Sequence, residues 1–138
     1  MFITAILLAS LCLRVLAAAE EQREPKSEIL SRSSTAWNGV PYTAYTKGIP
    51  ELAVLKITIP PHSKLKWHTH PIPSVAYILS GDITVEVPRG NHRRHFVAGQ
   101  VVPETVNTQH RGVTTDQPAV LIVFYAGAKG MLLTESGP

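Results

Sequence analysis

The feature that most limits the fold is a pair of histidines one residue apart, His68 and His70, in a proline-flanked run. Pro60–Pro61 precedes the pair and Pro71 follows it. Because proline fixes φ and lacks a backbone N–H, no long helix can pass through this segment. In an extended strand, side chains at i and i+2 point to the same face, so both imidazoles converge on one side. The sequence therefore predicts half of a metal site here, with a third ligand from another part of the chain.

Short apolar segments separated by turns make up most of the remaining sequence. They cover residues 52–59, 74–79, 83–87, 92–97, 101–106 and 118–126. After residue 19 no stretch has convincing helical periodicity. Short strands at regular spacing, with glycine and proline turns, indicate an all-β sandwich or barrel. An immunoglobulin-like sandwich is the alternative, but nothing in that fold requires histidines one residue apart.

Length and charge narrow the classes of partner. The chain has 138 residues, a net charge of +3 and 17% charged residues. This length fits one domain, and the low charge content excludes global disorder. Because the basic residues form no dense run, we expect a small-molecule ligand rather than a nucleic acid. We expect a polar arm over residues 20–36, the barrel over 37–130 and a tail over 131–138.

The first 19 residues have the pattern of a signal peptide. The apolar run Phe2–Leu13 is too short to span a membrane, and Ala17–Ala19 supplies the small residues of a cleavage site. We therefore expect a periplasmic or secreted protein with no stable membrane anchor once this segment is removed. Cys12 is the only cysteine and lies inside the segment, so the mature chain would have neither a disulfide nor a thiolate ligand.

The run from His68 to Gly81 resembles the first motif of the cupin superfamily, which pairs two histidines with a later glutamate and a glycine. His68, His70 and Gly81 occupy their places, whereas Ser74 occupies the glutamate place. The resemblance extends over residues 52–126. It implies a single-domain, jelly-roll-like double-stranded β-barrel with a metal at its centre. Small cupins commonly pair, and edge strands need cover, so we also expect a homodimer.

The second cupin motif begins with a glycine and ends with a histidine and an asparagine, and Gly99 and His110 fall on that spacing. Its other places hold Thr105, Asn107 and Thr114 instead of the motif residues. The resemblance implies that His110 joins the histidine pair as the third ligand. The metal would be a divalent transition ion such as Fe, Mn, Zn, Ni or Cu.

The serine at the glutamate place leaves the rest of the metal environment open. A serine hydroxyl is a poor ligand unless ionised, so Ser74 is predicted to contact the metal environment only indirectly. Gln100, Glu104 and Gln109 lie near the third histidine in the sequence, and each could restore a fourth ligand. Strand alternation favours none of them clearly, although it predicts that Trp67 faces away from the metal.

Two functions are compatible with this pattern. The first is a metal-dependent enzyme, of oxygenase or isomerase type, acting on a small organic molecule through a three-histidine centre. The alternative is a non-catalytic module that binds or senses a small molecule in the same pocket, which the missing glutamate favours slightly. Since one fold hosts many functions, the sequence leaves the substrate and the catalytic residues undetermined.

Overall fold

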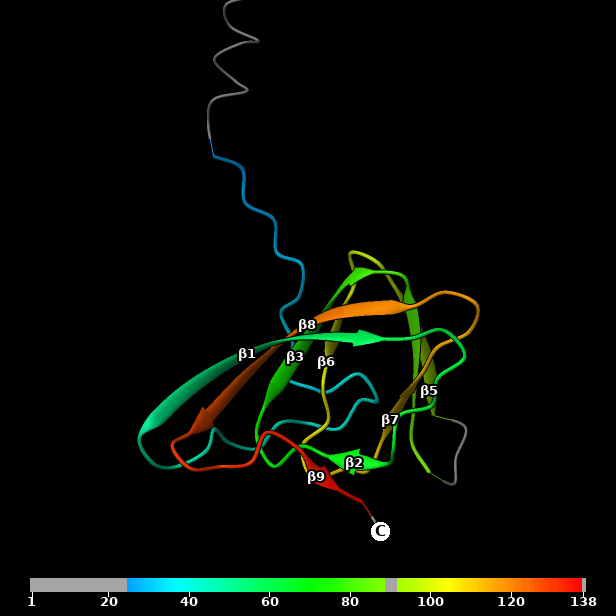
Figure 1. Cartoon of the computed structure of the whole chain (residues 1–138). Helices are drawn as coiled ribbons and strands as arrows, with labels where there is room; N and C mark the ends of the chain where they lie inside the picture. Colours follow the sequence, from blue (N-terminus) through cyan, green and yellow to red (C-terminus); the bar gives the residue numbers. More distant parts are fainter. Residues whose placement is uncertain (1–24, 89–91, 138) are drawn as a thin grey trace, which may run out of the picture.

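The computed structural model describes residues 25–88 and 92–137 (Figure 1). The predicted signal peptide, the first residues of the predicted polar arm (20–24) and residues 89–91 lie outside the described residues. All regular elements in the described residues are β-strands, in agreement with the all-β prediction. The described part of the chain contains no helix long and apolar enough to cross a membrane. Residues 25–34 are exposed and lead from the N-terminal side into the barrel.

Nine strands form in the described part of the chain. They are β1 (Pro50–Ile59), β2 (His68–Thr69), β3 (Ser74–Ser80), β4 (Asp82–Glu86), β5 (Arg93–Val97), β6 (Val101–Pro103), β7 (Arg111–Val113), β8 (Ala119–Ala128) and β9 (Glu135–Ser136). One sheet has the order β1-β8-β3-β6 and a second has the order β5-β4-β7. The short pair β2-β9 forms a third sheet at one end of the barrel (Figure 1).

Alternating side chains explain how the sheets enclose a core. Along β8 the inward positions Leu121, Val123 and Tyr125 are buried, while the intervening side chains are more exposed. The same period of two holds in β3, where Ala76 and Ile78 are buried. Because side chains alternate across a strand, each sheet presents one apolar face to the interior. The core therefore lies between the two larger sheets.

Gly81, the glycine of the first motif, makes the turn from β3 into β4. Its φ is +73°, in the left-handed region where side chains are strained. A Cβ atom at this position would overlap the backbone carbonyl of Pro118. The turn therefore requires glycine, and it directs β4 away from the first sheet into the second.

The last described residues return to the mouth of the barrel. We call residues 131–137 the C-terminal strap. Its strand β9 pairs antiparallel with β2, so that His68 lies opposite Ser136. The amide of Gly137 donates a hydrogen bond to the carbonyl of Trp67. The strap thus lies directly beside the histidine pair.

Candidate metal centre

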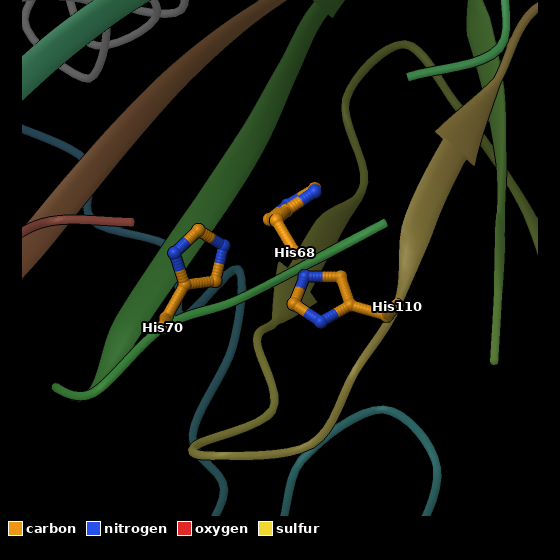
Figure 2. A group of neighbouring side chains, drawn as sticks. All are labelled: His68, His70 and His110. Carbon is orange, nitrogen blue, oxygen red and sulfur yellow. The ribbon is translucent and has the colours of Figure 1, made fainter. Parts of the chain in front are cut away.

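The three predicted histidines come together in space (Figure 2). His68 belongs to β2, His70 follows that strand, and His110 immediately precedes β7. One ring nitrogen of each lies within 4.8 Å of the corresponding atoms of the other two. His70 and His110 are buried, and His68 is half-buried. The extended conformation predicted for the pair is present, and both imidazoles face His110.

Backbone pairing brings the third histidine to the first. The amide of His68 donates to the carbonyl of His110 at 3.0 Å, and the amide of His110 donates back to His68 at 2.9 Å. The two residues are therefore a directly opposed antiparallel pair. His70 is fixed in the same way, because its carbonyl accepts a hydrogen bond from the amide of Asn107. The arrangement is set by these main-chain contacts.

Each imidazole is oriented through its Nδ1 atom. Nδ1 of His68 lies 2.8 Å from the carbonyl oxygen of Lys66, and Nδ1 of His70 lies 2.8 Å from that of Leu133. Nδ1 of His110 lies 2.9 Å from the carbonyl oxygen of Thr108. Since a carbonyl only accepts, each Nδ1 must carry the proton and donate it, which leaves each Nε2 with a lone pair. This is how metal-binding histidines are commonly oriented by their outer partners.

His110 fits a metal ligand most clearly. Its side chain is only 2% exposed, and its Nε2 atom has no hydrogen-bond partner among the described residues. The side-chain oxygen of Thr105 lies 2.9 Å from Nδ1 and adds to the contact with Thr108. A buried, unpartnered polar atom is costly unless something else satisfies it. A cation bound by the Nε2 lone pairs would do so, and the three residues therefore fit a divalent transition metal.

Glu104 changes the charge of this environment. Its carboxylate lies 3.3 Å from Nε2 of His110, with no hydrogen-bond geometry between them. Burial lowers the pKa of His68 and of His70. Burial also acts to lower the pKa of His110, but the Glu104 carboxylate and the Thr108 carbonyl outweigh it, and that pKa is raised. Burial therefore keeps two of the imidazoles neutral, the form that binds metal, while Glu104 concentrates negative charge beside the third.

A cavity of about 320 Å³ adjoins the histidines inside the barrel. Aliphatic side chains make up much of its wall, among them Ile57, Ile59, Leu65, Val102, Leu121 and Val123. A groove of about 520 Å³ on the outer side of the barrel, beside Tyr45 and Phe124, is lined by none of the histidines. The inner cavity is therefore the candidate site, and its walls suit a small, largely apolar molecule.

Comparison with solved structures finds the same architecture elsewhere. The DMSP lyase DddQ from Ruegeria pomeroyi DSS-3 matches with a TM-score of 0.55 and 21% identity, over 71% of this chain and 46% of the lyase. A cupin-like protein from Thermotoga maritima matches with a TM-score of 0.53 and 19% identity, over 62% of this chain and 64% of that one. A Klebsiella pneumoniae protein with a double-stranded β-helix domain matches with a TM-score of 0.54 and 15% identity, over 84% and 97% of the chains.

The chain has the cupin fold. The double-stranded β-barrel prediction is confirmed, although no family model and no curated protein matches the sequence. The chain spans about half the length of the lyase it resembles. Since the cupin fold hosts many functions, the chemistry has to be argued from the site itself.

Of the side chains proposed to complete the cupin site, only Glu104 reaches the cavity. Ser74 is buried on the face of β3 that also carries Ala76, and its hydroxyl has no hydrogen-bond partner in the described structure. It is among the residues that line the outer groove and is not in the lining of the cavity. The side chain of Gln109 lies against the backbone of Gly137. Gln100 instead accepts a hydrogen bond from the amide of Val97 in the turn after β5.

The direction of the Trp67 side chain stays a prediction, because the cavity lining includes the consecutive residues Leu65 to His68. Trp67 lines the cavity, and the guanidinium of Arg111 lies 4.1 Å from the centre of its ring. Arg111 is itself ion-paired with Glu86 at 2.7 Å.

The C-terminal strap is the part of the site that the sequence did not reveal. The carbonyl of Leu133 holds His70, and Thr134 lines the cavity. The only sequence signal was a leucine pair, Leu132–Leu133, in an otherwise polar tail. Without a known partner for β2, this short segment could not be placed.

Proposed function

We propose that the protein binds a divalent transition metal through Nε2 of His68, His70 and His110, and uses it on a small organic molecule in the barrel cavity. The observation that supports this best is the common orientation of the three rings. All three Nδ1 atoms face backbone carbonyls, so all three Nε2 lone pairs are free for a metal. Three protein ligands leave coordination positions for a substrate, as in catalytic rather than structural metal sites.

The roles of the protein groups follow from this geometry. When bound, the metal would supply Lewis acidity to an oxygen of the substrate. The aliphatic wall, including Leu121 and Val123, would exclude water and orient the apolar part of the molecule. Trp67 and Ser136 lie in the lining next to the histidines, where they would contact the bound molecule. An oxygenase- or isomerase-type reaction fits a cavity of this size and character.

A non-catalytic binding module is the alternative function. Its main support in the sequence was the missing glutamate at position 74. The presence of the Glu104 carboxylate in the cavity removes much of that support. The likeness to a DMSP lyase also favours an enzyme, because that protein uses the same fold for catalysis.

Metal analysis of protein purified without an affinity tag tests the proposed function. We expect bound transition metal in the wild type and its loss in His70→Ala, because no other imidazole on that segment can replace it. His95→Ala is the matched control, since His95 is an exposed histidine on β5. Equal metal content in the two variants would contradict the proposed site. Oxygen-uptake and isomerisation screens of the loaded protein then separate an enzyme from a binding module.

We also propose that the protein is exported and forms a homodimer. Support for export is the residue 1–19 pattern, and mass spectrometry of the protein from its native cell should find cleavage near Ala19.

Support for a dimer is an exposed apolar row across three strands, in which Phe124 lies between Val54 and Val75. Phe124→Asp should lower the solution mass to that of a monomer, and a monomeric wild type would refute the dimer.

A further inference from the structure

The backbone places Glu104 next to the residue that replaces the cupin glutamate. The strands β3 and β6 are antiparallel, with Val75 opposite Pro103. One step further along, the amide of Glu104 donates a hydrogen bond to the carbonyl of Ser74 at 3.0 Å. Ala76 and Val102 are also paired and both line the cavity. Ser74 lies two residues before Ala76 on the inward face of β3, and Glu104 itself lines the cavity, so the two residues share the inward side.

The carboxylate is held in place only through its backbone. The carbonyl of Glu104 accepts a hydrogen bond from the hydroxyl of Tyr42 at 2.7 Å. Its Oε2 atom, in contrast, is buried and has no hydrogen-bond partner within the described residues. A buried carboxylate oxygen without a partner is among the most costly groups in a protein interior. A group other than the described residues would therefore satisfy it.

The atom that Oε2 faces is in the same situation. Nε2 of His110 lies 3.3 Å away, is also buried and also lacks a partner. Because Nδ1 of His110 faces the Thr108 carbonyl, Nε2 of the neutral imidazole carries a lone pair, and this lone pair faces the carboxylate oxygen. Ligand atoms about 2.0–2.2 Å from a common metal lie about 2.8–3.1 Å apart in an octahedral site and about 3.3–3.6 Å apart in a tetrahedral one. The separation of these two atoms is that of neighbouring ligands of one cation.

We propose that Glu104 is the carboxylate ligand of this metal centre, provided from the end of β6 in place of the glutamate that Ser74 replaces. This inference rests on the three-histidine site proposed above. The small side chain of Ser74 leaves space on the shared face for the longer one of Glu104. The protein would thus keep a site of three imidazoles and one carboxylate, with the carboxylate on the neighbouring strand.

A carboxylate swap, followed by Co²⁺ titration of the metal-free full chain, tests the assignment. The visible absorption of bound Co²⁺ reports its coordination independently of any activity. Glu104→Gln should change this spectrum and weaken Co²⁺ binding by about 100-fold or more, beyond the usual effect of an outer partner. The double variant Ser74→Glu with Glu104→Gln should recover affinity to within about tenfold, because the carboxylate returns from the adjacent strand. Glu135→Gln, an exposed carboxylate on β9, is the control for charge.

The outcomes separate this inference from the proposed function. If Glu104→Gln binds Co²⁺ with wild-type affinity and spectrum, Glu104 is not a ligand and the three-histidine site stands. A swap variant that binds no better than Glu104→Gln would also overturn the assignment. Failure of the wild type to bind Co²⁺ would overturn both. Circular dichroism of each metal-free variant shows whether it has folded, and the swap tests the ligand even if Glu104→Gln is less stable.

Discussion

Removing the C-terminal strap should weaken metal binding without unfolding the barrel. The strap, residues 131–137, contributes no strand to either of the two larger sheets, so its removal leaves those sheets paired. It does remove the carbonyl of Leu133, which lies 2.8 Å from Nδ1 of His70, and the partner strand of β2. His70 would then lose the contact that fixes both its tautomer and its ring orientation.

The magnitude follows from what the strap does for this ring. A neutral hydrogen bond contributes about 0.5–1.5 kcal/mol by itself. Outer partners of metal-binding histidines typically change affinity by about 10–100-fold, because they also orient the ring. That range corresponds to about 1.4–2.8 kcal/mol of binding free energy. We therefore expect the truncated protein to bind Zn²⁺ about 10–100-fold more weakly in a competition titration against a chromophoric chelator.

A point variant separates orientation from packing. Leu133→Ala keeps the backbone carbonyl but removes a side chain that packs, partly buried, against the core. Replacing a fully buried leucine with alanine lowers the free energy of unfolding by about 2–5 kcal/mol, and the loss here should be smaller because Leu133 is only partly buried. The Zn²⁺ affinity should stay near that of the wild type. A truncated protein that keeps its circular dichroism spectrum and binds Zn²⁺ as tightly as the full chain would refute the proposed role of the strap.

Two further predictions concern stability. Gly81→Ala should destabilise the fold by about 2–5 kcal/mol in urea unfolding, since overlap with the Pro118 carbonyl adds to left-handed strain. Gly99→Ala, with φ +86° but nothing near the added Cβ, should cost only about 1–2 kcal/mol. Burial and, to a smaller extent, the Glu104 charge raise the pKa of Tyr42 from 10.0 to about 12. The stability difference between wild type and Tyr42→Phe should therefore be constant below pH 10 and decline between pH 10 and 12, and a difference that grows with pH would contradict it.

The barrel and its three histidines could be predicted because their signals are local or regularly spaced. His68 and His70 share a face by strand geometry alone, and alternating apolar segments predict the sheets that enclose the site. The third histidine required a spacing pattern from Gly99, because nothing in the neighbourhood of His110 identifies its partner. The structure adds the reason, which is the reciprocal backbone pair between His68 and His110.

The carboxylate could not be assigned from the sequence, because its position depends on strand register. The strand β6 has only three residues, too few for alternation to show which way the next side chain points. Only the pairing of Val75 with Pro103 places Glu104 beside Ser74 on the inward face. The strap was missed for a related reason, because a two-residue strand has no periodicity and is defined only by the strand it joins.

The same dependence on backbone pairing suggests how metal binding affects the protein. His68 and His110 are joined by two main-chain hydrogen bonds, and His70 by one to Asn107. The backbone itself therefore holds the three ligands near one another, and we expect little chain ordering to oppose metal binding. Most of the binding free energy should then appear as stabilisation of the folded state, which alone brings the three segments together.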